Sequence, residues 1–251
     1  METNIHGADA QPASPALSVH TVPAGGALQQ RVRDHLQQSA QVTMAAVARC
    51  QDDIMAAAHI IAGAMRSGGK LLLCGNGGSA ADCQHLATEF VSRLTKDFKR
   101  PALAAIALTT DTSFLTAFAN DCGFAGIFQR QVEALGRPGD VLLGVSTSGS
   151  SNNVVLAVEA ATAQGMQTIT LCGEGGKLAG MSTRNIAVPS RYTPHIQETH
   201  LAIEHVLCDV VERLLFGQSF GEPGSRIPET PGLCRAVPMA CPANDSEETE
   251  Q

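Results

Sequence analysis

Between Lys70 and residue 216, short apolar runs alternate with stretches whose apolar residues recur at helical spacing. The apolar runs have the length of strands, and most of the stretches between them can hold a helix. A chain that repeats strand, loop and helix folds into a parallel sheet with helices on both faces, because parallel neighbours are joined by crossover connections. We therefore predict an α/β fold with a five-stranded parallel sheet, its strands at Leu71–Cys74, Leu103–Leu108, Val141–Val145, Thr168–Cys172 and Asn185–Val188.

Helices are expected at about 80–94, 124–135, 153–164, 177–181 and 196–216. Ahead of the sheet, apolar residues recur at helical spacing from Leu28 to Met65, and Gly68 and Gly69 follow as a stop signal. This segment predicts one or two extra N-terminal helices. Because they lie outside the repeating pattern, they need a partner surface, which points to an oligomer.

The two ends of the chain differ from its middle in composition. Residues 1–26 mix Pro, Ala, Gly and Ser without periodicity, and residues 218–251 are first rich in Pro and then acidic. Neither segment can bury a core, so both are predicted to be disordered, as an arm and a tail. One domain is expected over residues 27–217.

Composition excludes several functions. A net charge of -7 argues against binding to nucleic acid or to a membrane surface, but not against a small anion held by backbone amides. The eight cysteines include no CxxC pair, so neither a zinc knuckle nor a disulfide-exchange site is indicated, and a reducing compartment is the simpler reading. The start of the chain lacks a secretory signal, and no apolar run could span a bilayer. We therefore expect a soluble, cytoplasmic protein.

In an open parallel sheet, ligands bind beyond the C-terminal ends of the strands, so the loops there are the candidate sites. The first strand is followed by Gly75, Asn76, Gly77, Gly78 and Ser79 at the start of a helix. Glycines allow close approach of the backbone, and the free amides of a first helical turn attract an anion. The sequence is neither GxGxxG nor a P-loop, and a plain tight turn is the alternative.

The third strand is followed by a run of hydroxyl residues. Several hydroxyls at a helix start can donate hydrogen bonds to a phosphate, whereas a simple N-cap needs only one. Asp111 lies in the polar loop after the second strand, and its side chain suits either sugar hydroxyls or an N-cap. The run of hydroxyl residues and the glycine that interrupts it are Ser146, Thr147, Ser148, Gly149, Ser150 and Ser151.

Two helices carry side chains suited to catalysis or metal binding. His85 and Glu89 are four residues apart and so share a helix face, although such a pair is more often a surface contact. Gln197 and His205 lie on the last helix, where polar residues also fit a solvent-facing stripe. The eight residues between them rise about 12 Å on an unbroken helix. They could share one ion only if Gln197 preceded the regular helix or different subunits contributed.

Taken together, these residues resemble the sugar isomerase (SIS) domain, a flavodoxin-like αβα sandwich, and within it the phosphoheptose isomerases. The resemblance covers about residues 28–216, although Pro194 and His195 depart from the usual residues before the IQE sequence. The matching stretches are GNGGSAADCQHLATEF (75–90), TTDTS (109–113), NDCGF (120–124), STSGSS (146–151) and IQETHLAIEH (196–205).

The resemblance implies an aldose–ketose isomerase. It would convert sedoheptulose 7-phosphate into D-glycero-D-manno-heptose 7-phosphate through an enediol, for nucleotide-activated heptose and lipopolysaccharide or other surface polysaccharide. Glu89 and His205 would be the acid/base pair, and one Zn²⁺ per subunit of a homotetramer would bind His85, Glu89, Gln197 and His205. The substrate would contact Asn76, Gly77, Gly78, Ser79, Glu89, Thr110, Asp111, Ser146, Thr147, Ser148, Ser151 and Gln197.

Three other functions share this scaffold. Relatives of the isomerases form non-catalytic SIS tetramers that bind the replication initiator protein, but the resemblance implies that they lack the counterparts of Glu89 and His205. A ligand-sensing module of a transcription regulator would need a helix-turn-helix and a basic face. An isomerase or lyase for amino-sugar phosphates also fits, because loops that bind the phosphate do not read the length of the sugar.

Overall fold

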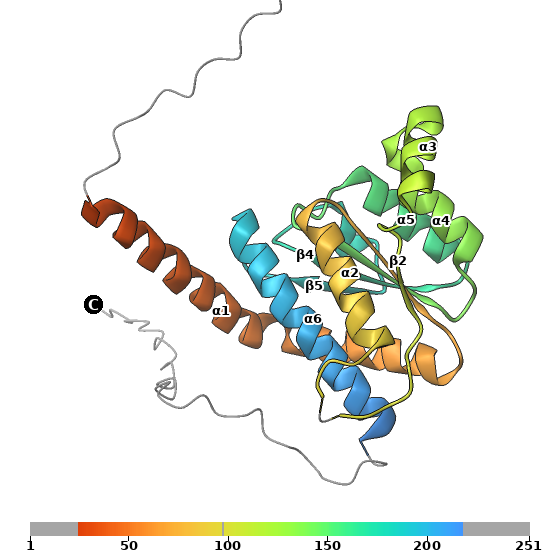
Figure 1. Cartoon of the computed structure of the whole chain (residues 1–251), viewed down its shortest axis with the longest axis horizontal. Helices are drawn as coiled ribbons and strands as arrows, with labels where there is room; N and C mark the ends of the chain where they lie inside the picture. Colours follow the sequence, from red (N-terminus) through yellow and green to blue (C-terminus); the bar gives the residue numbers. More distant parts are fainter. Residues whose placement is uncertain (1–24, 97, 218–251) are drawn as a thin grey trace, which may run out of the picture.

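The computed structural model describes residues 25–96 and 98–217, and the predicted tail lies outside them, as does the predicted arm except for Gly25 and Gly26. Its centre is one sheet of five parallel strands in the order β2-β1-β3-β4-β5, which confirms the predicted fold class (Figure 1). Each pair of neighbouring strands runs parallel. The strands are β1 (Leu71–Gly75), β2 (Ala105–Ala107), β3 (Val141–Ser146), β4 (Gln167–Cys172) and β5 (Arg184–Ala187).

Helices cover both faces of the sheet, because alternate residues of each strand point to opposite sides. Leu71 and Leu73 belong to a core cluster that also contains residues of α1, α2 and α6. Leu72 belongs to a second cluster, formed with α4 and α5. The helices are α1 (Gly25–Arg66), α2 (Gly78–Val91), α3 (Thr112–Cys122), α4 (Ile127–Leu135), α5 (Asn152–Ala163) and α6 (Thr193–Phe216), with short 3₁₀ helices η1 (Phe124–Gly126) and η2 (Lys177–Gly180).

The N-terminal segment is a single helix of 42 residues rather than two. Its second half packs on the sheet, where Ala57, Ala58 and Ile61 are buried, whereas its first half extends beyond the sheet (Figure 1). Leu28 and Leu36 in that first half are exposed. An exposed apolar stripe on a long helix is consistent with the predicted need for a partner surface.

Three helical segments differ from the prediction. The segment 124–135 divides into η1 and α4, and the segment 177–181 is the 3₁₀ helix η2. Helix α3 is absent from the prediction because its sequence begins with the polar run of the loop after β2. None of its residues is fully buried, although Leu115 and Phe118 pack against the second core cluster and Phe114 and Phe118 stack with their ring centroids 5.4 Å apart.

Helices α2 and α6 lie side by side and run in the same direction. Successive residues of α2 contact successive residues of α6 from the N-terminal end onward. Gly78 meets Gln197 near their N-termini, and His85 meets His205 farther along. At the far end, the Arg100 guanidinium bonds Glu212 of α6 at 2.7 Å and donates to the carbonyl of Glu89, also at 2.7 Å. Arg100 therefore holds the end of α2 against α6.

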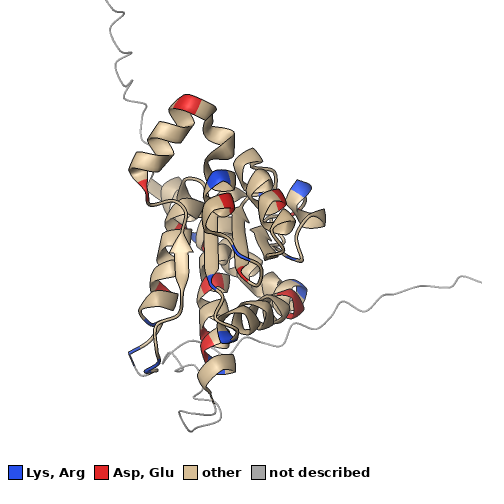
Figure 2. Ribbon diagram, turned by 90° about the vertical axis from the view of Figure 1, so that its right-hand side faces the viewer, with Lys and Arg blue, Asp and Glu red and all other residues tan. Residues whose placement is uncertain are grey.

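In the view of Figure 2, acidic and basic residues are interspersed over the described chain. Within the described ranges, no helix is long and apolar enough to cross a membrane. All six described cysteines are free.

Candidate active site

The candidate site lies where β1 and β3 are neighbours in the sheet. The chain crosses from β1 to β2 on one side and from β3 to β4 on the other, so the loops after β1 and β3 diverge, and ligands of open parallel sheets bind at such a point. Asn76 follows β1, and Asn153 lies in the first turn of α5, after β3. The amide of Asn76 donates to Asn153 at 2.9 Å, and the amide of Asn153 donates to Asn76 at 2.8 Å. The two predicted anion loops are therefore tied together.

The glycine loop after β1 is built so that the backbone can approach a ligand and α6. Gly77 has a positive φ of 56°, which favours glycine, and it immediately precedes the first residue of α2. A side chain at Gly78 would collide with the amide nitrogen of Gln197. The loop thus presents the amides of a first helical turn beside the Gln197 side chain. Ser79 of the same turn is buried.

The hydroxyl loop after β3 differs from an ordinary helix cap. Ser151 occupies the N-cap position of α5, but its side chain makes no capping bond. Its hydroxyl instead lies 3.0 Å from the hydroxyl of Ser146, which in turn lies 3.4 Å from that of Ser148. Three hydroxyls therefore gather at the start of a helix, where an anion is favoured. This geometry favours the phosphate interpretation of the loop over the simple cap.

The loop after β2 has a more local role. Asp111 is the N-cap of α3 and accepts a hydrogen bond from the amide of Phe114 at 2.9 Å. The Thr110 hydroxyl donates to the carbonyl of Ala107 at 3.1 Å. The structure therefore favours the capping interpretation of Asp111. Contacts of Thr110, Asp111 and Thr147 with a substrate stay predictions.

His85, Glu89 and His205 form one cluster between α2 and α6. The Nε2 atom of His85 lies 2.8 Å from Nε2 of His205 and 3.6 Å from a carboxylate oxygen of Glu89. The His85 side chain is 42% exposed and that of Glu89 is 16% exposed, so the cluster opens to solvent on one side. Two imidazoles and one carboxylate are a donor set that suits a divalent transition metal with an open position.

Gln197 lies apart from this cluster. It is the fifth residue of an unbroken α6, so the helix rise of about 12 Å to His205 is not shortened. The amide of Gln197 lies against Gly78, the first residue of α2, seven residues before His85. Within one chain, therefore, the structure places His85 against both Glu89 and His205 and leaves Gln197 apart. The role of Gln197 as a ligand stays a prediction.

Several buried polar residues of this region have no role in the predicted site. Asn153 is one, and its two amide bonds need the fold before they can be seen. Glu204 is another: burial, with Asp82 nearby, raises the pKa of its carboxyl to about 8. His200 is also fully buried, and burial lowers its pKa to about 4. Both lie among apolar neighbours on α6, and this sequence pattern indicates that they are buried.

The fold, with its tied loops after β1 and β3, is that of an α/β domain of the sugar isomerase (SIS) type. The SIS domain pattern matches residues 34–173. A phosphoheptose isomerase from Roseiflexus sp. is 50% identical over 74% of this chain and 93% of its own length. The structure of the phosphoheptose isomerase from Neisseria gonorrhoeae superposes with a TM-score of 0.69 at 45% identity, covering 73% of this chain and 98% of that one.

A second solved structure agrees. The phosphoheptose isomerase from Francisella tularensis gives a TM-score of 0.71 at 36% identity, covering 74% of this chain and 98% of that one. The chain therefore belongs to the SIS-domain family, in its phosphoheptose isomerase group. These relatives are named as enzymes, so the comparisons do not support the non-catalytic, initiator-binding alternative.

Proposed function

We propose that the chain is an aldose–ketose isomerase that converts sedoheptulose 7-phosphate into D-glycero-D-manno-heptose 7-phosphate. The observation that carries the proposal is the cluster of His85, Glu89 and His205, in which an imidazole and a carboxylate on different helices meet the same side chain. The membership in the phosphoheptose isomerase group supports the choice of substrate.

The phosphate would bind at the two loops tied by Asn76 and Asn153. The hydroxyls of Ser146, Ser148 and Ser151 would donate to its oxygens, since the last of these is not used as a helix cap. The first-turn amides of α2 would add further donors, and helix N-termini favour negative charge. Anchoring the phosphate at one end fixes the sugar along α2, with its carbonyl end toward Glu89.

The reaction moves one proton between adjacent carbons. Glu89 would take the proton from the carbon beside the ketone, which gives the enediol, and return it to the former carbonyl carbon. His205 would exchange a proton with the two oxygens, so that one gains the proton that the other loses. Each such proton-transfer group typically contributes about 10²–10⁴-fold to the rate.

A zinc ion fits the cluster on its donor set, and His85, Glu89 and His205 would hold it. When bound, it would polarise the carbonyl and stabilise negative charge on the enediolate oxygens. Gln197 would join only through the amide that now faces Gly78, by turning away from it or by serving a site shared with another subunit.

The assembly, location and pathway follow as parts of the same proposal. The exposed apolar residues Leu28, Val32 and Leu36 of α1 support a homotetramer in which α1 is covered. Free thiols support a cytoplasmic location. The aldose product would feed nucleotide-activated heptose for lipopolysaccharide or another surface polysaccharide.

The test is to incubate the purified full chain with sedoheptulose 7-phosphate and to follow the aldose phosphate by chromatography. We expect conversion that a chelator lowers and added Zn²⁺ restores. A parallel incubation with an amino-sugar phosphate ketose separates the related isomerase function. Conversion of the amino sugar alone, or of neither sugar by a correctly folded protein, contradicts the proposal.

A further inference from the structure

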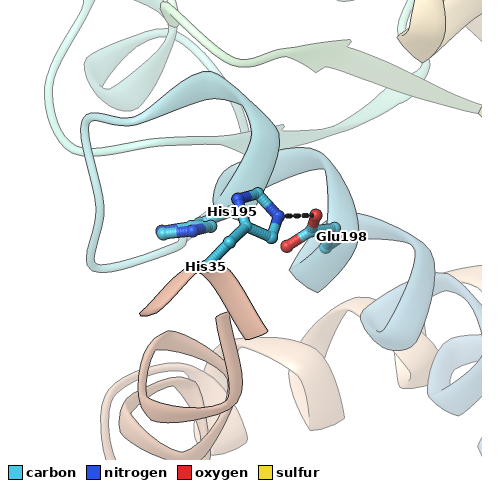
Figure 3. A group of neighbouring side chains, drawn as sticks. All are labelled: His35, His195 and Glu198. Atoms are coloured by element: carbon cyan, nitrogen blue, oxygen red, sulfur yellow. Dashed lines mark hydrogen bonds and ion pairs between the residues drawn. The ribbon is translucent and has the colours of Figure 1, made fainter. Parts of the chain in front are cut away.

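A second group of possible metal ligands lies between α1 and α6. It consists of His35 of α1 and of His195 and Glu198 in the first two turns of α6 (Figure 3). The three candidate ligand atoms lie within 4.8 Å of one another. Nε2 of His35 is 2.7 Å from a carboxylate oxygen of Glu198, and the rings of His35 and His195 have centroids 4.7 Å apart.

His195 is the most informative member of the group. Its residue is only 4% exposed, and its buried Nε2 atom has no hydrogen-bond partner. A buried polar atom without a partner costs free energy, and a bound cation would remove that cost. The ring is also fixed in place, because Tyr192 packs edge-on against it with centroids 4.6 Å apart.

We propose that His35, His195 and Glu198 form a second site for a divalent transition cation of the Zn²⁺ class. Two imidazoles and a carboxylate are the ligands such a cation prefers. His195 and Glu198 are three residues apart and so share one side of α6. Bonds of about 2.0–2.2 Å would separate the ligand atoms by about 3–3.5 Å, which needs only small movements. The side chains of His35 and Glu198 are 30% and 43% exposed, so the cation can enter and keep a water or another ligand.

This site is separate from the one proposed for catalysis. It shares no residue with the His85, Glu89 and His205 cluster, and Glu198 precedes His205 by seven residues, about 10.5 Å of helix rise. Its effect would be structural, because it joins the first half of α1 to the start of α6. The rest of that half of α1 is largely exposed, so the cation would pin a helix that has few other contacts.

The experiment counts metal in the full-length protein and does not depend on isomerase activity. The background variant carries His85→Ala and His205→Ala, which removes two ligands of the first cluster. Metal-free protein is dialysed against Zn²⁺, its zinc content is measured by mass spectrometry, and its affinity is measured by titration. The cluster is tested by adding His35→Ala or Glu198→Gln to this background. The matched control is His59→Ala, which removes an exposed histidine of the same helix.

We expect one Zn²⁺ per chain in the background variant and in the His59→Ala control. His35→Ala should weaken binding by more than roughly 100-fold, since even outer partners of ligands contribute 10–100-fold. Zn²⁺ should also raise the melting temperature of the background variant, and His35→Ala should abolish that increase, because a ligand of the folded state stabilises it. Alanine is a good helix former, so α1 is kept. Equal zinc content and affinity with and without His35 would overturn the proposal, as would no tight binding in the background variant.

Discussion

The side-chain amides of Asn76 and Asn153 donate to each other's oxygens, at 2.9 and 2.8 Å. The first residue follows β1 and the second lies in α5, 77 residues later in the chain. This pair joins the glycine loop to the hydroxyl loop where the connections leaving β1 and β3 run away from each other. The phosphate end of the proposed site is thus braced by a pair of amides.

Replacing Asn153 by alanine should therefore loosen both loops. Asn76 would lose a donor and an acceptor while half-buried, which costs about 1–3 kcal/mol of stability. We expect a rise in KM for the sugar phosphate that exceeds the fall in kcat, measured by steady-state kinetics, together with a lower melting temperature. Asn152→Ala is the control, because Asn152 is exposed one residue away. Equal effects of the two substitutions would contradict the bridging role.

Glu89→Gln keeps the shape of the side chain but removes its basicity. We expect kcat to fall by roughly 10²–10⁴-fold while the substrate still binds, because the phosphate loops are untouched. Calorimetric titration with the sugar phosphate measures the binding. Glu159→Gln, an exposed glutamate of α5, should be silent in both measurements. Full activity of the Glu89 variant would remove this carboxylate from the mechanism.

Gly78→Ala should displace Gln197, because the added carbon would collide with its amide nitrogen. A shift of about 1 Å in a positioning group can cost roughly 10²-fold in kcat/KM, and we expect a loss of that order. Gly63→Ala is the control, since nothing lies within 4 Å of the added carbon inside α1. That substitution should leave kinetics unchanged and stabilise the fold by about 0.5–1 kcal/mol.

We expect the free energy of unfolding to depend on pH through the carboxyl of Glu204. Burial, aided by Asp82, raises the pKa of its carboxyl to about 8, well above the value in the unfolded chain. The folded state therefore keeps a proton that the unfolded state has lost, so this group lowers the free energy of unfolding by about 1.4 kcal/mol per pH unit between pH 4.5 and 8. Chemical denaturation of metal-free protein at several pH values should show that slope.

Glu204→Gln should remove this contribution, because the amide does not ionise. The variant should be more stable than the native chain at pH 8, and the two should converge near pH 5. Asp82→Asn should give a smaller effect in the same direction, since the Asp82 charge is the lesser cause of the raised pKa. Parallel pH profiles for the native chain and Glu204→Gln would show that the carboxyl is not protonated in the folded protein.

For the buried ion pair of Arg100 and Glu212, removing one partner should cost more stability than replacing both by apolar residues. Their side chains are 0% and 2% exposed, and the guanidinium also binds carbonyls at the end of α2. Arg100→Ala should lower the free energy of unfolding by about 3–5 kcal/mol, because a buried carboxylate is left alone. Arg100→Met combined with Glu212→Leu should cost less than Arg100→Ala in urea unfolding. A larger loss in the double variant would contradict this account.

Much of the fold was predictable because it depends on local patterns. The residues of Leu71–Cys74 and Val141–Val145 are buried on both faces of the parallel sheet, so each strand is an unbroken apolar run in the sequence. Strands β1 and β3 begin as predicted. Helix α3 was not predictable in the same way. It begins in a polar loop, with Asp111 as its N-cap, and this polar run conceals the start of the helix in the sequence.

The candidate site also contains parts that local sequence patterns predict and parts that they do not. The sequence by itself determined the loops, since glycines before a helix and clustered hydroxyls after a strand follow from backbone geometry and local hydrogen bonding. It also placed His85 and Glu89 on one face, because helical spacing is local. Only the tertiary structure decided that His205 meets His85, that Asn153 holds Asn76, and that Gln197 faces Gly78 instead. Those contacts join residues 77 to 120 positions apart. No local propensity specifies such contacts, because the packing of α2 and α6 and the order of the strands must form first.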